Sequence, residues 1–241
     1  MRDLAIRDLG RIGWRAATAV QEQLVAERKQ GLIPDTLLFA EHAHVITMGR
    51  NGHRENLLAS AEVLSRSGIA LEETNRGGDV TYHGPGQVVG YPILDLNGWK
   101  RDVHLYVRAL EEVLIVTLAE FGIVAERAAG MTGVWTGGAK IAAIGVHLSR
   151  WVTSHCFALN VATDLSYFGY IVPCGLRKPV TSMRAQGVEA ARETVLDRLS
   201  RNFEQIFDRE RVTYGRSDAA DGREYRRGNA DQMVEEAGRH C

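Results

Sequence analysis

The sequence has few cysteines and no paired cysteine motif. Its 241 residues include three cysteines, at positions 156, 174 and 241, and no CxxC pair. Because the number is odd and the spacing is wide, these thiols argue against a disulfide framework and against a zinc site built from cysteines. We therefore expect free thiols and no metal site.

The sequence also lacks a long apolar run and a strong net charge. Charges at Arg2, Asp3, Arg7 and Asp8 interrupt any signal-peptide core, and no apolar run of about 18 residues occurs. Lysine and arginine number 29 against 30 acidic residues, a formal charge of -1. Such a balance gives no global field for nucleic acid or an anionic membrane. These absences predict a cytoplasmic protein without a nucleic-acid or membrane partner.

The residues that are present predict an α/β fold of the α+β type. Apolar periodicity predicts helices over residues 11–29, 56–65, 103–121 and 191–207. Apolar and β-branched runs predict strands in a short N-terminal segment and at 36–40, 44–48, 69–73, 123–127, 133–136, 140–148 and 153–161. Since helices and strands do not alternate regularly, we expect mixed, mostly antiparallel sheets flanked by helices.

The distribution of apolar residues predicts one domain followed by a tail. Residues 1–213 contain no linker and no internal repeat, so we expect them to form a single domain. Residues 214–241 are rich in glycine and charge and poor in large apolar side chains. Such a segment cannot bury enough surface to order itself, so we expect a disordered tail.

A glycine-rich segment, Arg76-Gly-Gly-Asp-Val-Thr-Tyr-His-Gly-Pro-Gly-Gln87, is the first candidate site. Its four glycines surround the strand-like residues 80–83. Glycine lets backbone amides approach a ligand closely, although turns around an edge strand would explain the same glycines. Arg76, Tyr82 and His83 favour a substrate site. The segment matches neither the Walker nor the GxGxxG motif, so nucleotide-phosphate binding has little support.

Cys174 is the candidate nucleophile. It stands between Pro173, which fixes φ, and Gly175, which frees the outgoing chain, so it can present a thiol at a turn. A packed cysteine is the alternative, since free cysteine behaves as a small hydrophobe. A nucleophilic Cys174 needs a cation beside it to lower its pKa from about 8.5.

Lys140 is the candidate cation. It begins an apolar strand directly after a glycine turn, in a chain whose basic residues are mostly arginine. A lysine beside a thiolate can stabilise it and also exchange a proton, which arginine cannot do near neutral pH. The alternative is a solvated strand end.

The remaining thiols and histidines are weaker candidates. Cys156 has His155 next to it, but neighbouring strand residues point to opposite faces, so we expect Cys156 to be packed. Cys241 ends the tail and has no expected role. His42 and His44 share one predicted strand face and lack a third metal ligand at a sensible spacing.

Several motifs in one order carry a resemblance to a known family. They are Glu41–Arg50, Arg76–Gln87, Gly133-Val-Trp135, Lys140–Gly145, His155 with Phe157–Asn160, and Pro173-Cys-Gly175. Together they resemble the octanoyl-[acyl-carrier-protein]:protein N-octanoyltransferase family of lipoate biosynthesis. The glycine-rich segment and the Pro-Cys-Gly turn are specific in combination.

The resemblance implies a biotin/lipoate protein ligase-like single domain and a complete reaction. An octanoyl or lipoyl group passes from acyl-carrier protein through a Cys174 thioester, with Lys140 as its partner, to a lysine of a lipoyl domain. The implied acceptors are the lipoyl domains of 2-oxoacid dehydrogenase complexes and the glycine cleavage H protein, and neither ATP nor a metal is needed. The implied substrate-binding residues are Arg76, Gly77, Gly78, Asp79, Val80, Thr81, Tyr82, His83, Ala143, Ile144, Gly145, Cys156, Phe157 and Ala158.

One position departs from the family pattern. Where the family usually shows His-Gly, this chain has His155-Cys156. A thiol there could narrow the pocket or add a second sulfur that accepts an acyl group.

Three other classes of protein compete with the transferase. An ATP-dependent lipoate or biotin ligase of the same fold needs no cysteine, because an acyl-adenylate carries the activation. A module that binds acyl groups or carrier domains would keep the glycine-rich segment without using Cys174 or Lys140. A papain-like hydrolase lacks its cysteine-flanking motif here.

Overall fold

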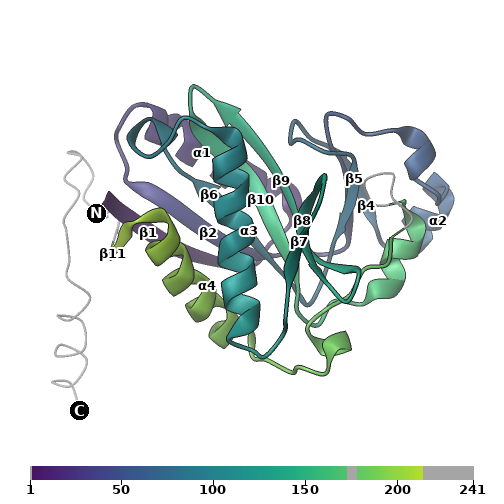
Figure 1. Ribbon diagram of the computed structural model, residues 1–241. Coiled ribbons are helices and arrows are strands. Elements are labelled where there is room, and N and C mark those ends of the chain that lie inside the picture. Colours follow the sequence, from purple (N-terminus) through teal and green to yellow (C-terminus); the bar gives the residue numbers. More distant parts are fainter. Residues whose placement is uncertain (1, 173–177, 214–241) are drawn as a thin grey trace, which may run out of the picture.

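An eight-stranded sheet runs through the molecule (Figure 1). The computed structural model describes residues 2–172 and 178–213. In spatial order the strands are β11 (Arg209–Val212), β1 (Arg2–Arg11), β2 (Asp35–Glu41), β6 (Gln87–Ile93), β10 (Val152–Asn160), β9 (Ala139–Ser149), β8 (Met131–Thr136) and β7 (Glu126–Ala128). Strand β1 is parallel to β11 and to β2, and each further pairing is antiparallel. The predicted mixed, mostly antiparallel sheet is confirmed.

A smaller sheet lies beside the large one, at the right of Figure 1. Its strands, in spatial order, are β4 (Ala70–Glu73), β3 (Val45–Met48) and β5 (Val80–His83). Its apolar side chains form a core of their own with Leu64 of α2 (Ala61–Arg66) and with Phe168 of the 3-10 helix Leu165–Tyr170. Residues 80–83 of the glycine-rich segment therefore belong to this smaller sheet.

Helices cover both faces of the large sheet. Helices α3 (Val103–Ala119) and α4 (Arg192–Phe207) pack on one face, in front of the sheet in Figure 1. Helix α1 (Trp14–Lys29) packs on the other face against β6 and β10. The Asp102 side chain caps α3 by accepting from the Leu105 N–H at 3.0 Å, which satisfies one free amide of its first turn. None of the helices in the described ranges 2–172 and 178–213 is long and apolar enough to cross a membrane.

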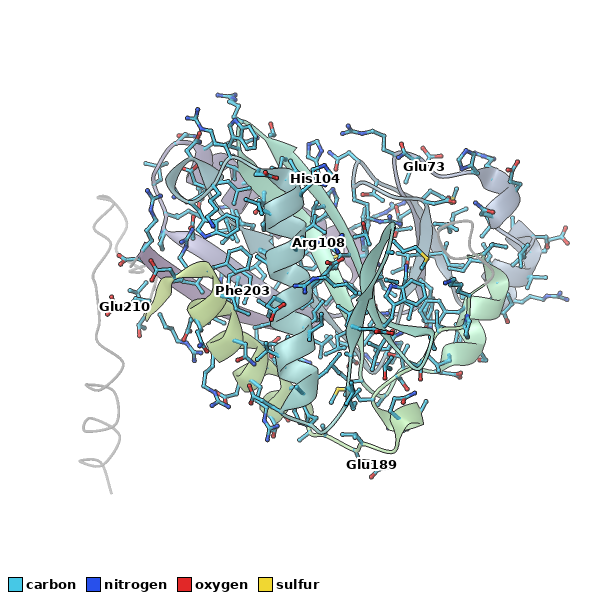
Figure 2. All side chains as sticks on the ribbon, in the orientation of Figure 1. Glu73, His104, Arg108, Glu189, Phe203 and Glu210 are labelled. Carbon is cyan, nitrogen blue, oxygen red and sulfur yellow. The ribbon has the colours of Figure 1, made fainter. Side chains whose placement is uncertain are left out.

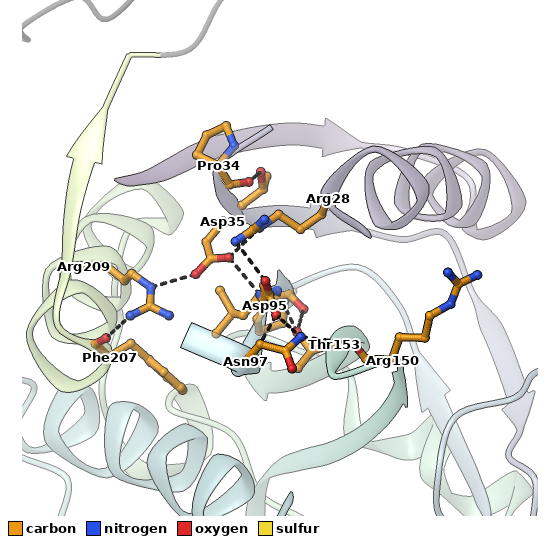
Figure 3. Close-up of polar contacts among 12 residues, drawn as sticks. Arg28, Pro34, Asp35, Asp95, Asn97, Arg150, Thr153, Phe207 and Arg209 are labelled. Atoms are coloured by element: carbon orange, nitrogen blue, oxygen red, sulfur yellow. Dashed lines mark hydrogen bonds and ion pairs between the residues drawn. The ribbon is translucent and has the colours of Figure 1, made fainter. Parts of the chain in front are cut away.

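A buried ion cluster ties the two ends of the domain together (Figure 3). Asp35, at the start of β2, accepts from Arg28 Nε and from Arg209 Nε, both at 2.8 Å. It also accepts from the Asp95 backbone N–H at 2.9 Å. Asp35 and Arg209 are both buried. The pair holds β11, the last strand of the described chain, to the N-terminal half.

Some predicted elements had the wrong extent, and two strands were not predicted. The N-terminal strand is not short, since β1 has ten residues. The helix predicted at 56–65 is a 3-10 turn, Arg54–Asn56, followed by the shorter α2, whose start is fixed by the Ser60 cap. Strands β6 and β11 were missed. Strands β8 and β9 form a hairpin whose turn is at Gly137 and Gly138.

Candidate active site

The glycine-rich segment joins the small sheet to the large one. Residues 76–79 form a loop before β5, and the Gly77 N–H donates to the Val146 carbonyl of β9 at 2.9 Å. Two glycines allow this close approach. A Cβ on Gly77 would lie 3.2 Å from the Val146 carbonyl oxygen, and one on Gly145 would lie 3.1 Å from the Gly77 carbonyl oxygen. On the side of the small sheet, a Cβ on Gly49 would lie 2.2 Å from the Gly78 carbonyl oxygen, and Gly78 has a φ of 87°. The backbone of the loop is therefore in direct contact with β9 of the large sheet.

Arg76 fixes the loop from inside. Its buried guanidinium donates to the Thr47 carbonyl at 2.7 Å, to Thr47 Oγ1 at 3.0 Å and to the Gly77 carbonyl at 3.1 Å. The charge also acts on the nearest histidine of β10. Burial, together with the Arg76 charge, lowers the pKa of His155 to about 4.

Asp79 connects the loop to the residues before position 173. Its carboxylate accepts from the Val80 N–H at 2.8 Å, from the His53 N–H at 2.9 Å and from the Asn56 side-chain amide. The Asn56 carbonyl in turn accepts from the Val172 N–H at 2.7 Å. Asp79 is thus linked by hydrogen bonds through Asn56 to Val172, two residues before Cys174 in the sequence.

Strand β5 supplies Val80, Thr81, Tyr82 and His83, of which Thr81 alone is not buried. The Tyr82 hydroxyl lies 2.8 Å from His44 Nδ1, and burial raises the pKa of Tyr82. Burial lowers the pKa of His83 to about 3, so its imidazole is neutral at physiological pH. These two groups are held neutral within the layer.

The residues predicted on β9 and β10 are paired one to one. Gly145 lies opposite Cys156, Ile144 opposite Phe157, and Ala143 opposite Ala158. Strand alternation divides them between the two faces. The backbone of Gly145 lies under the Arg76 loop, while Phe157 packs with the α3 and α4 core and Ile144 lies against that core. The predicted residues of β9 and β10 therefore lie next to one another, but the side chains of Ile144 and Phe157 do not point toward the glycine-rich loop.

Cys156 is a packed thiol. It is 6% exposed and belongs to the apolar cluster that α1 covers, which includes Leu38, Val89 and Tyr91. Burial raises its pKa to about 11, although the Arg76 charge opposes this shift. A thiol with this pKa is uncharged at neutral pH and is a poor nucleophile.

Lys140 lies at the start of β9 and is only 8% exposed, so it is not a solvated strand end. Its Nζ lies over the Trp135 ring, 4.8 Å from the centroid. Its backbone N–H donates to the Pro179 carbonyl at 2.9 Å, and its carbonyl accepts from the Thr181 N–H at 2.9 Å. The backbone of Lys140 is therefore hydrogen-bonded to residues 179–181.

Cys174 lies outside the described residues, together with Pro173 and Gly175. The described chain stops at Val172, which Asn56 holds, and resumes at Lys178, next to the residues that Lys140 holds. The structure thus describes both neighbours of the predicted nucleophile but not the thiol itself. Cys241 also lies outside the described residues.

His42 and His44 do not share a strand face, so that prediction was wrong. Both fall between β2 and β3. His42 Nε2 lies 2.6 Å from the Tyr91 hydroxyl, whereas His44 stacks on Tyr167 at 4.2 Å between centroids. No group of three or more His, Cys, Asp or Glu side chains suited to a metal ion occurs within residues 2–172 and 178–213.

Two residues that received no role from the sequence link the parts of the site. Gln87 Oε1 accepts from His83 Nδ1 at 2.8 Å, and Gln87 Nε2 donates to Asn160 Oδ1 at 2.9 Å. Asn160 Nδ2 then donates to the Thr181 carbonyl at 3.0 Å, and the Thr181 N–H reaches Lys140. The only sequence signal was that Gln87 and Asn160 end two of the motifs. Their buried contact spans 73 residues of sequence.

The fold is of the class seen in solved lipoate-protein ligases. The solved structure of lipoate-protein ligase A bound with ATP superposes with a TM-score of 0.73 at 18% identity, over 88% of this chain and 90% of that one. At this identity the likeness concerns the fold. The family model described as the lipoyl protein ligase A/B catalytic domain matches residues 14–204. The chain belongs to this family.

Curated relatives narrow the comparison within the family. An octanoyltransferase of Solibacter usitatus is 66% identical over 208 residues, which are 86% of this chain and 94% of the relative. An octanoyltransferase of Koribacter versatilis is 52% identical over 211 residues, 85% of this chain and 84% of the relative. The resemblance expected from the motifs is confirmed.

Proposed function

We propose that the chain transfers an octanoyl group from acyl-carrier protein to a lipoyl-domain lysine through a thioester on Cys174. Its family and its octanoyltransferase relatives establish octanoyl transfer in protein lipoylation and make the chain an acyltransferase. A carrier-protein donor and lipoyl-domain acceptors follow from that activity. The acyl-enzyme, its residues and the particular acceptors are the proposal.

The observation that carries the proposal is the double hydrogen bond between the Lys140 backbone and residues 179–181. It fixes a buried lysine to the chain that follows Cys174. On the other side, the Val172 N–H, two residues before Cys174 in the sequence, donates to the Asn56 carbonyl at 2.7 Å. A lysine held this way is suited to stabilise a thiolate on that segment.

The proposed chemistry has two exchanges at one carbonyl carbon. The Cys174 thiolate attacks the carrier thioester, a new carbon–sulfur bond forms, and the carrier thiol leaves with a proton. A neutral lysine amine of the lipoyl domain then attacks, the bond to Cys174 breaks, and the amine proton is lost to a base. Lys140 supplies the proton that leaves with the carrier thiol in the first step, and the neutral Lys140 then takes the amine proton in the second. Each step conserves the acyl group without ATP.

The tetrahedral intermediates need hydrogen-bond donors for the oxyanion. Two amides of the glycine-rich segment are already engaged, since Gly77 donates to Val146 and Val80 donates to the Asp79 carboxylate. They are unsuited to that role. The donors of the proposed reaction therefore come from other amides at the site.

We propose that the donor is octanoyl-acyl-carrier protein and that the acceptors are the lipoyl domains of 2-oxoacid dehydrogenase complexes and the glycine cleavage H protein. We further propose that the reaction takes place in the cytoplasm and needs neither ATP nor a metal. The raised pKa of Cys156 supports Cys174 as the nucleophile, because a buried neutral thiol cannot replace it.

A transfer assay tests the proposal. Octanoyl-carrier protein, a lipoyl domain and the enzyme are mixed without nucleotide and in the presence of a chelator, and octanoylated lipoyl domain is measured by mass spectrometry. We expect transfer with the wild type and with Cys156→Ala, and none with Cys174→Ser. Strict dependence on ATP would instead assign a ligase, and loss of transfer in Cys156→Ala alone would move the nucleophile to Cys156.

A further inference from the structure

Trp135 places an aromatic ring on Lys140. The two residues lie directly opposite each other on β8 and β9, and Lys140 Nζ is 4.8 Å from the ring centroid. Trp135 is 3% exposed. A cation over an indole face is attracted by the ring quadrupole, and more strongly where little water competes. The contact is therefore of the stronger, desolvated kind.

Gly133 leaves room for the lysine chain beneath that ring. It has a φ of 118°, and a Cβ there would lie 2.7 Å from the Ala142 carbonyl oxygen and 3.4 Å from Lys140 Cε. The Gly133 N–H donates to Glu111 of α3, a fully buried carboxylate, at 3.1 Å. Helix α3 thus fixes β8 at the point where the Lys140 side chain passes.

The indole N–H supports a role beyond packing. Trp135 Nε1 is buried and has no hydrogen-bond partner within the described part of the chain. An unpaired buried donor costs free energy, and phenylalanine would fill an aromatic site without that cost. Tryptophan is the aromatic residue that attracts a cation most strongly. Cation binding therefore accounts for the larger ring at this position.

The other charged groups near this site are exposed or are paired with arginine. Lys178 lies 5.4 Å from the same centroid but is exposed. Glu126, opposite Trp135 on β7, is exposed as well. Glu111 is paired with Arg108 at 2.6 Å and with Arg127 at 3.2 Å, and Figure 2 shows Arg108 on α3 beside β7 and β8. Lys140 is thus the buried cation that the ring holds.

We propose that Trp135 is a positioning residue for the transfer reaction, because its ring holds the Lys140 ammonium in one orientation. The proposal rests on the proposed part of Lys140 in octanoyl transfer. Trp135 acts through the lysine and needs no contact with the acyl group. It should therefore affect kcat and leave the KM for the carrier protein unchanged.

Fluorinated tryptophan tests the ring face without changing the fold. Fluorine withdraws electron density from indole and weakens its attraction for a cation. The full chain, which has four tryptophans, is prepared with indole rings of increasing fluorine content and assayed for transfer. We expect kcat to fall stepwise, to about a tenfold loss, which corresponds to about 1.4 kcal/mol. In Trp135→Phe, the matched background, kcat should not depend on fluorination.

Acylation of Lys140 by a small reagent tests the contact itself. Labelling of Lys140, followed by peptide mapping, should become about tenfold faster in Trp135→Leu and change much less in Trp135→Phe. The control is Trp99→Leu, since Trp99 carries Lys100 at 5.5 Å away from this site. That substitution should leave Lys140 labelling unchanged.

The two measurements separate failure of this proposal from failure of the proposed function. A kcat that is flat across the fluorinated series, or that falls equally in Trp135→Phe, overturns the positioning role. Absence of transfer in the wild type defeats the proposed function instead. In that case Lys140 labelling still decides the contact, because an unchanged rate in Trp135→Leu contradicts it.

Discussion

Burial distinguishes the two candidate thiols at the scale of single residues. Cys156 stands at the position where a glycine was expected, and it packs into the cluster under α1 with its pKa raised to about 11. We therefore expect that Cys156 is not acylated at neutral pH. The sequence analysis predicted a packed Cys156, but it could not identify the residues on α1, β2 and β6 that bury the thiol.

Lys140 should control the reactivity of Cys174. In Lys140→Ala we expect the pH of half-maximal alkylation of Cys174 to rise by about one unit or more, since a nearby cation stabilises the thiolate. Iodoacetamide labelling with peptide mapping, from about pH 5 to about pH 10, measures this pH. The range covers both a thiol with a lowered pKa and one with the ordinary pKa of about 8.5. Lys100→Ala, which also removes a lysine from a tryptophan ring, is the control. An unchanged profile in Lys140→Ala would remove Lys140 from this role.

His83 should make the fold sensitive to acid. Burial lowers its folded-state pKa to about 3, below the ordinary 6.5. As pH falls below 6.5, the unfolded chain binds a proton that the folded chain does not. The stability present above pH 6.5 is therefore lost progressively toward pH 3, by up to about 1.4 kcal/mol per pH unit.

Urea unfolding at several pH values between 7 and 4 measures this loss. In His83→Gln the slope of unfolding free energy against pH should be smaller by about that amount. The exposed His104→Gln, on α3 in Figure 2, is the matched control. Equal slopes in wild type and His83→Gln would show that His83 is not the titrating group.

At the scale of elements, the sequence predicted the helices and strands that have a clear apolar periodicity and missed those that do not. The apolar periodicity that predicted a helix at 103–121 reflects Leu110, Leu114 and Leu118, which are buried on α3, whereas Val103, at the start of the helix, is exposed. Strand β6 was missed because it is buried on both faces and contains a glycine and a proline, so it shows no alternation. Strand β11 was missed because three of its four residues are charged.

The close contact between Gly49 and the glycine-rich loop can be tested directly. Gly49→Ala places a Cβ 2.2 Å from the Gly78 carbonyl oxygen, so the loop must move. We expect a loss of about 2 kcal/mol of unfolding free energy and reduced transfer. Gly169→Ala, where a Cβ meets nothing within 4 Å, should leave both nearly unchanged. Chemical denaturation of the two variants decides, and equal stabilities would contradict the close contact.

At the scale of the whole molecule, contacts between distant segments hold the site together. The chain of hydrogen bonds from His83 through Gln87 and Asn160 to Thr181 links both sheets to the segment after residue 177. No local pattern encodes it, because each partner is specified by the tertiary fold. For the same reason the sequence predicted a set of candidate site residues but not which faces Ile144 and Phe157 occupy.

The Asp35 cluster should be essential to the stability of the domain. Asp35→Asn leaves the buried Arg209 without its counter-charge, so we expect a loss of about 3–5 kcal/mol of unfolding free energy. Glu73→Gln removes one partner of an exposed pair, Arg54 with Glu73 at 3.9 Å, and should change stability by less than about 1 kcal/mol. Thermal and urea unfolding measure the stabilities of the two variants. A small effect of Asp35→Asn would show that the cluster is not needed.

The acyl-enzyme itself is the most direct test of the central claim. The chain is mixed with octanoyl-carrier protein alone, without ATP or acceptor, and its intact mass and the labelled peptide are determined. The account predicts one octanoyl group on the peptide that contains Cys174 and none on the peptide that contains Cys156. An octanoyl group on Cys156, or no adduct until ATP is added, would contradict it.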